Sequence, residues 1–173
     1  HSKQTILIVG GSSGSRVINT AIRGLLPELL KNYNVIHLCG KDNLDETLTE
    51  TTGYAQFEYA NKELSDMFAL ADLVISRAGA NAICELLALR KPNILIPLSA
   101  AASRGDQILN ANSFRSQGFS YVLEEEELSN TTLLEAIEHV FQKKEEYIKA
   151  MENSNSRNSI DTIIGLILDA SKK

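Results

Sequence analysis

The chain alternates between short apolar runs of strand length and longer segments whose apolar residues recur every three or four positions. The clearest run is Ile6-Leu7-Ile8-Val9, which is apolar throughout, as expected of a strand buried on both faces of a parallel sheet. We interpret five further runs as strands, near residues 34–39, 54–59, 72–75, 93–97 and 119–123. Strands that alternate with helices predict an α/β fold with a doubly wound, Rossmann-like six-stranded parallel sheet in the strand order 3-2-1-4-5-6.

Helices are predicted between the strands and at the end of the chain. Asn61 is expected to cap one helix, and Ser129 or Asn130 another, because short polar side chains accept hydrogen bonds from the first free N–H groups of a helix. Two connections are predicted to be irregular, a loop at 98–104 and a solvated acidic linker at 124–127. The predicted helices span residues 17–26, 44–51, 61–70, 83–89, 106–114, 130–141, 145–153 and 160–170.

Length and composition indicate a single globular domain over residues 1–173, with 43% hydrophobic and 23% charged residues. The net charge of −5 makes a nucleic-acid partner unexpected, because such proteins usually carry a basic patch. No stretch approaches the ~20 apolar residues of a membrane span, and no signal peptide is visible. Cys39 and Cys84 fall in a predicted strand and a predicted helix, which favours buried thiols in a reducing compartment. We therefore expect a cytoplasmic chain.

The stretch from Ser76 to Glu85 is the first candidate binding site, because it joins an apolar strand to a helix through Gly79. The free N–H groups of a first helical turn and the helix dipole attract an anion such as a phosphate. About one turn further on, Glu85 offers a carboxylate to a hydroxyl-rich group. The alternative interpretation is an ordinary strand–helix connection that only needs a glycine.

A second candidate anion site is the glycine-rich loop Gly10-Gly11-Ser12-Ser13-Gly14-Ser15, which follows the first strand and precedes a helix. As a motif it is weak, because it matches neither the dinucleotide fingerprint nor the phosphate loop of ATPases. In the predicted strand order, however, this loop and the stretch from Ser76 to Glu85 meet at the switch point of the sheet, where such folds bind ligands. Their convergence favours a nucleotide.

Asp106 and Gln107 form a third candidate site at the start of the helix after the fifth strand. The Asp106 carboxylate only accepts hydrogen bonds, whereas the Gln107 amide both donates and accepts, and this combination suits the hydroxyls of a sugar ring. The alternative is structural, because acidic residues are common at the start of a helix. No catalytic arrangement can be assembled from the three histidines, because His1 is terminal, His37 is expected to be a hydrogen-bonded core residue and His139 lies far from the crevice. No cluster has metal-ligand spacing, so neither a metal nor another cofactor is expected.

The sequence resembles the donor half of MurG-type UDP-N-acetylglucosamine glycosyltransferases, which have the GT-B fold. The resemblance covers nearly the whole chain but only the C-terminal half of the family's length. It implies an inverting transfer of N-acetylglucosamine to lipid I in peptidoglycan synthesis, with the N-terminal acceptor domain absent from this chain. The resemblance rests on Gly10-Gly11-Ser12-Ser13-Gly14-Ser15-Arg16 with Asn19, Ser76-Arg77-Ala78-Gly79-Ala80 with Glu85, Pro92, Ile96-Pro97, Asp106-Gln107 and Asn110-Ala111.

The resemblance also implies a role for each part of the site. Ser12 and the amides around it would hold the diphosphate, the amides after Gly79 would face a phosphate or the sugar, and Glu85 would accept from the ribose hydroxyls. Asp106 and Gln107 would contact the N-acetylglucosamine ring, and the loop at 59–61 would meet the uracil. The complete set of predicted substrate-binding residues is Gly11, Ser12, Ser13, Gly14, Ala60, Asn61, Leu64, Arg77, Gly79, Ala80, Asn81, Ala82, Glu85, Asp106 and Gln107.

The sequence departs from the family pattern in three places. Asp106 stands where a second Gln is common, which leaves the identity of the sugar open, and Asn81 and Ala82 differ from some members. The missing acceptor domain would supply the catalytic base and the surface that holds the lipid-linked acceptor. No catalytic residue is therefore expected here, and the full-length enzyme would be peripheral at the inner face of the cell membrane.

Two alternatives stay open from the sequence. The chain could be the donor domain of another GT-B enzyme, either a glycolipid glycosyltransferase or a UDP-N-acetylglucosamine 2-epimerase, although an epimerase should carry additional acidic and histidine residues in the crevice. It could instead be a non-catalytic α/β nucleotide-binding module. That alternative predicts that Glu85→Ala and Asp106→Ala leave ligand binding unchanged.

Overall fold

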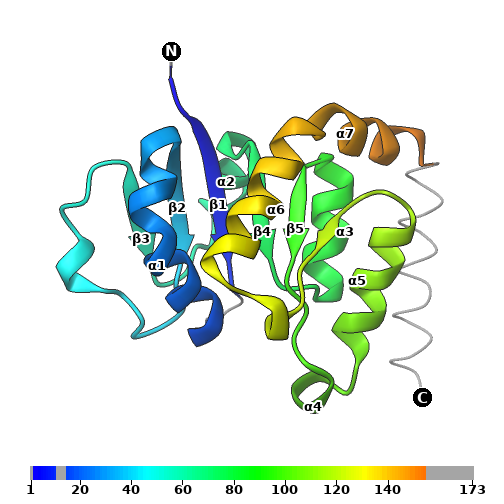
Figure 1. Ribbon diagram of the computed structural model, residues 1–173, viewed down its shortest axis with the longest axis horizontal. Coiled ribbons are helices and arrows are strands. Elements are labelled where there is room, and N and C mark those ends of the chain that lie inside the picture. Colours follow the sequence, from blue (N-terminus) through cyan, green and yellow to red (C-terminus); the bar gives the residue numbers. More distant parts are fainter. Residues whose placement is uncertain (1, 11–14, 155–173) are drawn as a thin grey trace.

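A computed structural model of the chain describes residues 2–10 and 15–154 (Figure 1). Its six strands form one parallel sheet in the order β3-β2-β1-β4-β5-β6, which confirms the predicted fold class and strand order. The sheet is sandwiched between helices, and its carboxyl edge faces downward in Figure 1. The strands are β1 (Gln4–Val9), β2 (Tyr33–Leu38), β3 (Tyr54–Phe57), β4 (Leu73–Ser76), β5 (Asn93–Leu95) and β6 (Tyr121–Val122).

The helices divide between the two faces of the sheet, and each face has its own core cluster. One cluster holds α1 (Arg16–Asn32) and α6 (Asn130–Gln142), and the other holds α2 (Leu64–Leu70), α3 (Ala80–Leu89), α5 (Asp106–Ser116) and part of α7 (Lys144–Asn153). Alternate residues of β1 serve both clusters, because Ile6 and Ile8 lie in the first and Leu7 in the second. This arrangement explains why the run Ile6-Leu7-Ile8-Val9 of β1 is apolar throughout.

Four predictions for the connections need correction. Asn61 does not cap a helix, because residues 61–64 first form a turn closed by Leu64 N–H and Asn61 O (3.3 Å), and Glu63 holds the N-cap position of α2. The segment 44–51 contains only a 3₁₀ turn, η1 (Glu46–Leu48), and the loop at 98–104 contains the short helix α4 (Ala100–Ser103). The acidic run is not merely solvated, because it forms the 3₁₀ turn η2 (Glu125–Glu127) and Glu125 pairs with Arg77.

Other predictions agree with the structure. Ser129 caps α6 in a reciprocal capping box with Thr132. The helix predicted at 145–153 is α7, whereas the one predicted at 160–170 lies outside the described residues. The prediction that both cysteines are buried is confirmed for Cys39 and is wrong for Cys84, which is half-buried; both thiols are free.

The predicted core histidine, His37, lies in a buried hydrogen-bonded network between β2, β3 and α1. Its Nε2 faces Asn19 Oδ1 (2.8 Å) and its Nδ1 faces the Tyr54 hydroxyl (2.7 Å). Because Asn19 Nδ2 donates to Cys39 O (2.9 Å), Asn19 Oδ1 must accept, so His37 carries its proton on Nε2 and Nδ1 accepts from Tyr54. Burial, reinforced by the charge of Arg23, lowers the pKa of His37 to about 3.

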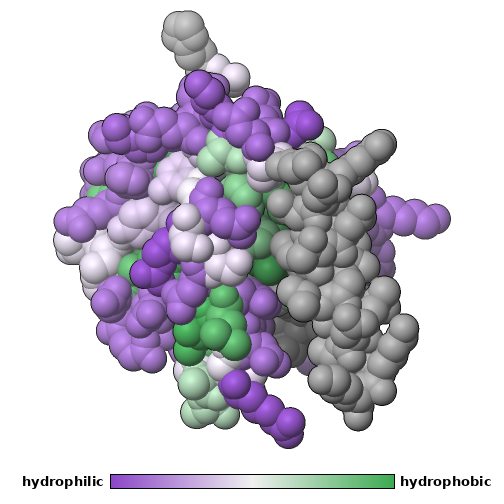
Figure 2. Space-filling model, turned by 90° about the vertical axis from the view of Figure 1, so that its right-hand side faces the viewer, coloured by the Kyte–Doolittle hydropathy of each residue, from purple (hydrophilic) through white to green (hydrophobic). Residues whose placement is uncertain are grey.

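The outer surface of the described region is mainly hydrophilic on the side that carries α5, with smaller apolar areas (Figure 2). Leu109 of α5 is the most exposed of the large apolar side chains, at 69%. Among the described helices, none is long and apolar enough to cross a membrane. In residues 2–10 and 15–154, no group of three or more His, Cys, Asp or Glu side chains is placed to hold a metal ion.

Candidate functional site at the carboxyl edge of the sheet

The parallel strands bring three sequence-predicted segments to one edge of the sheet. β4 ends at Ser76 beside Val9 of β1, and β5 pairs with the other side of β4. The turn from β4 into α3, the start of α5 after β5 and the loop after β3 therefore all leave the sheet at the edge that faces downward in Figure 1. Gly11, Ser12, Ser13 and Gly14, which were predicted to bind the diphosphate, lie outside the described residues.

The N-terminus of α3 has the form of an anion site. Gly79 occupies the N-cap position, no side chain caps the helix, and no acidic residue stands in its first turn. The first intrahelical bond runs from Ile83 N–H to Gly79 O (3.0 Å). The N–H groups of Ala80, Asn81 and Ala82 have no acceptor within the described part of the chain, so they remain available to a negatively charged ligand.

The turn before α3 is held in place by two side chains of α5. Gln107 Oε1 accepts from the N–H groups of Ala78 (3.2 Å) and Leu98 (2.9 Å), and Asn110 Nδ2 donates to Ala78 O (2.9 Å). Both polar groups of the Ala78 backbone are thereby fixed, directly before Gly79. Sequence reasoning did not select Asn110 as a site residue, although it stands one helical turn after Gln107.

The side-chain amide of Gln107 also directs an unpaired hydrogen-bond donor toward the N-terminus of α3. Since its Oε1 is fixed by two backbone donors, its Nε2 is the remaining end of the amide, and it has no acceptor among the described residues. A Cβ on Gly79 would lie 3.9 Å from this nitrogen, and Gly79 itself has an ordinary φ of −67°. The glycine is therefore not required by the backbone, and its missing side chain leaves open the space that Gln107 Nε2 faces.

The two helices that meet here each carry a carboxylate that has no partner among the described residues. Glu85 stands about one turn into α3 and is half-buried, whereas Asp106 is the first residue of α5 and is exposed. Gly105 introduces Asp106 with a φ of +86°, a backbone conformation that favours glycine. Within the described residues neither carboxylate forms an ion pair or a hydrogen bond, so both can accept from ligand hydroxyls.

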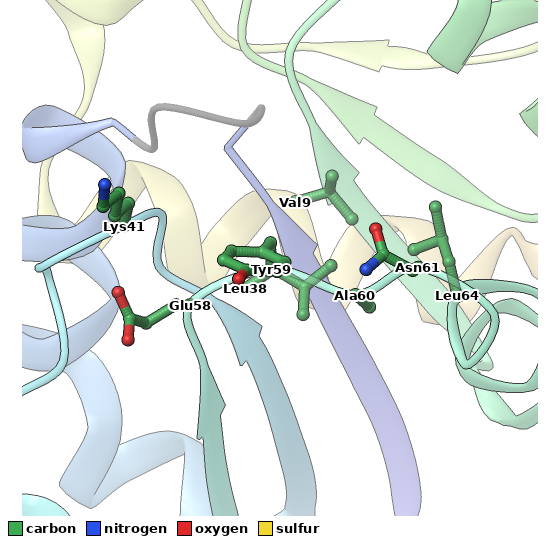
Figure 3. Close-up of a pocket in the computed structure, with 8 residues that line it drawn as sticks. All are labelled: Val9, Leu38, Lys41, Glu58, Tyr59, Ala60, Asn61 and Leu64. Atoms are coloured by element: carbon green, nitrogen blue, oxygen red, sulfur yellow. The ribbon is translucent and has the colours of Figure 1, made fainter.

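A mostly apolar pocket of about 450 Å³ opens beside this space, at the ends of β1, β2 and β3 (Figure 3). The structure brings together Tyr59, Ala60, Asn61 and Leu64, from the predicted loop and the start of α2, in the wall of this pocket. The volume lies in the range of small-molecule sites. Four further lining residues, not selected from the sequence, come from strand ends and adjoining loops: Val9, Leu38, Lys41 and Glu58.

Arg77 differs from the other predicted site residues because its side chain is already engaged by the protein. Its guanidinium donates to Ser15 Oγ (2.8 Å) and to Ile96 O (3.1 Å), and it forms an ion pair with Glu125. Ser15 is the N-cap residue of α1, where its Oγ accepts from Ile18 N–H (3.3 Å). The sequence placed Ser15 in the candidate anion loop and Glu125 in a solvated linker, and nothing in the local pattern indicates that Arg77 reaches them.

Replacing Asn110 by Ala should loosen the turn before α3. The Ala78 carbonyl would lose its donor while Gln107 still holds the N–H, and we expect a stability loss of about 1–3 kcal/mol, because a partly buried acceptor loses its partner. Urea unfolding measures this loss. Asn112→Ala is the matched control, because Asn112 lies on the same helix, is exposed and, within the described residues, has a side chain that hydrogen-bonds only to Arg115 (3.0 Å). Equal losses in the two variants would contradict the role of Asn110.

Residues 5–164 match the glycosyltransferase family 28 C-terminal domain, so the chain belongs to this family. It is 65% identical over 162 residues to the UDP-N-acetylglucosamine--N-acetylmuramyl-(pentapeptide) pyrophosphoryl-undecaprenol N-acetylglucosamine transferase of Lachnoclostridium phytofermentans, covering 94% of this chain and 46% of that protein. It is 57% identical to the protein of the same description from Lachnospira eligens, over 98% of this chain and 48% of that protein. The chain thus spans about half the length of these curated relatives.

Solved structures agree on the fold. The Acinetobacter baumannii MurG structure matches 95% of this chain and 50% of its own with a TM-score of 0.74, at 22% identity. A glycosyltransferase of kitacinnamycin matches 94% of this chain and 40% of its own with a TM-score of 0.75, at 15% identity. Both similarities confirm the expected architecture of one half of a GT-B glycosyltransferase.

Proposed function

We propose that this chain is the donor-binding half of an inverting glycosyltransferase that uses UDP-N-acetylglucosamine and transfers the sugar to lipid I. The uncapped start of α3, with Gln107 beside it, Glu85 further along the same helix and an apolar pocket at the neighbouring strand ends, is the observation that carries the proposal. The names of the curated relatives support the donor sugar and the lipid-linked acceptor, and they favour a transferase over an epimerase or a non-catalytic module.

The proposed ligand extends along the carboxyl edge of the sheet. The uracil occupies the pocket at Ala60, Asn61 and Leu64, Glu85 accepts from the ribose hydroxyls, and the amides of residues 80–82 face the diphosphate together with the loop at 11–14. The sugar lies toward α5, where Asp106 accepts from its hydroxyls and Gln107 donates through Nε2. Arg77 acts through the protein contacts described above.

The proposed reaction is a displacement at the anomeric carbon. The acceptor hydroxyl forms the new bond to this carbon, the bond from the carbon to the diphosphate oxygen breaks, and the acceptor proton passes to a base. Negative charge grows on the departing UDP in the transition state, and fixed amides at a helix N-terminus stabilise such charge. The base and the surface for the lipid acceptor are assigned to the half of the relatives that this chain does not span, so the chain alone should bind donor without turnover.

The complete enzyme is proposed to work at the cytoplasmic face of the membrane as a peripheral protein.

Calorimetry on this chain with UDP, ADP and CDP tests the proposal. We expect UDP to bind more tightly than either of the other two, by about tenfold, because a base-specific pocket adds hydrogen bonds that the wrong base leaves unmade. Equal affinity for the three nucleotides would remove the uracil assignment. Binding of none of them would remove the nucleotide site.

A further inference from the structure

A tight turn after β2 carries one lysine to the rim of the apolar pocket. Residues 40–43 form this turn, which is closed by the hydrogen bond from Asn43 N–H to Gly40 O (3.2 Å). Lys41 is its second residue and lines the pocket (Figure 3). Gly40 and Asp42 have φ values of +91° and +62°, and a positive φ is uncommon for a residue with a side chain. The chain therefore bends sharply at the point where Lys41 projects.

Two neighbouring elements hold this turn in place. Arg23 of α1 donates through Nη2 to Asn43 O (2.6 Å). Glu58, just after β3, accepts from Gly40 N–H with its carbonyl (2.8 Å) and from Asp42 N–H with its Oε2 (2.6 Å). The backbone of the turn is therefore fixed by both α1 and the end of β3.

The ammonium group of Lys41, in contrast, is exposed and unpaired. It forms no ion pair within residues 2–10 and 15–154, although the carboxylate of Glu58 lines the same pocket. Among the described residues of the pocket wall, Lys41 is the one with a cationic side chain. A lysine ammonium has three N–H donors and no acceptor, so a ligand that pairs with it must offer an acceptor.

We propose that Lys41 determines the base specificity of the pocket by donating a hydrogen bond to the 4-carbonyl oxygen of uracil. The inference rests on the proposed function, which places the uracil in this pocket and the ribose at Glu85 of α3. The strand order puts β2 and β3 on one side of β1, and β4, which leads into α3, on the other. In a pyrimidine ring, N1, which carries the ribose, and C4 lie on opposite sides. The 4-position therefore points away from α3, toward the ends of β2 and β3, where Lys41 and Glu58 lie (Figure 3).

The 4-position is also where uracil and cytosine differ in hydrogen bonding. Uracil presents a carbonyl oxygen there, which accepts, whereas cytosine presents an amino group, which donates. An ammonium that only donates therefore pairs with uracil and leaves the cytosine amino group without an acceptor. The carboxylate of Glu58 is held at the turn by Asp42 N–H. Lys41 thus offers a contact that depends on the base, whereas the ribose and phosphate contacts are the same for both nucleotides.

Calorimetry on this chain with UDP and CDP tests the inference, and thermal unfolding checks that each variant is folded. Lys41→Met removes the ammonium but keeps a side chain of similar length. We expect it to weaken UDP binding by about tenfold and to change CDP binding by less than about twofold, since a charge-assisted contact is lost for uracil alone. Lys41→Gln introduces an amide that both donates and accepts, so it should bind the two nucleotides about equally.

Lys62→Met is the matched control, because Lys62 is an exposed lysine that follows Asn61 directly, does not line the pocket and forms no ion pair among the described residues. Both of its Kd values should stay within about twofold of those of the unchanged chain. A larger loss of UDP than of CDP affinity in Lys62→Met would show that the effect belongs to lysine charge in general, and it would overturn the inference.

The remaining outcomes separate this inference from the proposed function. If Lys41→Met weakens UDP and CDP by the same factor, the lysine acts on the phosphate charge, and if it changes neither Kd, the lysine makes no contact. Either result overturns the inference and leaves the nucleotide site in place. If the unchanged chain binds neither nucleotide, or both equally, the proposed uracil site fails, and the inference fails with it.

Discussion

Glu85→Ala should weaken UDP binding by about 30–100-fold. The carboxylate of Glu85 has no protein partner in the described region, so its removal should cost little stability and act mainly on the ligand. In the proposed site it accepts from the two ribose hydroxyls. Hydrogen bonds to a charged group contribute about 1.5–3 kcal/mol, and a loss of about 2.0–2.7 kcal/mol corresponds to the stated change in Kd.

The ribose assignment can be separated from a general charge effect by comparing UDP with 2′-deoxy-UDP. The unchanged chain should prefer UDP, and Glu85→Ala should largely remove this preference. Asp66→Ala is the matched control, because Asp66 is an exposed carboxylate on the neighbouring helix α2 with no partner among the described residues. If Glu85→Ala weakens both nucleotides equally, Glu85 does not accept from the 2′-hydroxyl.

The fold was predictable because its determinants are local. An apolar run such as Ile6–Val9 signals a strand buried on both faces, and the alternation of such runs with helical periodicity leaves few topologies for a parallel sheet. The errors in the predicted helices and loops occur where a side chain and the backbone offer alternative hydrogen bonds to the same groups. At Asn61 the residue type favours a helix cap, but the chain first forms a turn and the helix begins at Leu64.

The position of the candidate site was predictable for the same reason, because carboxyl ends of neighbouring parallel strands meet at one edge. The roles of the individual residues inside the site were not predictable. Gln107 was expected only as a sugar ligand, yet its Oε1 holds the backbone at Ala78 and Leu98 while Nε2 stays free. Glu125 was expected to be solvated, yet it pairs with an arginine 48 residues away in the chain, and no local pattern specifies such a contact.

Acid should destabilise the folded chain through His37, and this is the largest expected effect on stability. The pKa of this histidine is lowered to about 3 in the fold by burial and by the charge of Arg23, from a usual value of 6.5. Below pH 6.5, His37 therefore binds a proton in the unfolded chain but stays neutral in the folded chain. Stability is fully present above pH 6.5 and falls as the pH decreases toward 3, by up to about 1.4 kcal/mol per pH unit and roughly 4 kcal/mol in all.

Urea unfolding between pH 7 and pH 4.5 measures this dependence above the range in which most carboxylates titrate. His37→Gln should be less stable at pH 7, because it breaks the contacts with Asn19 and Tyr54. As the pH falls, however, its free energy of unfolding should decrease less steeply, and the difference in slope should correspond to about one bound proton. His139→Gln, at an exposed position on α6, serves as the matched control for removing an imidazole from the chain. If the His37→Gln and unchanged curves run parallel, the buried imidazole is not what makes the fold sensitive to acid. A slope difference confined to His37→Gln would assign that sensitivity to the network that joins β2, β3 and α1.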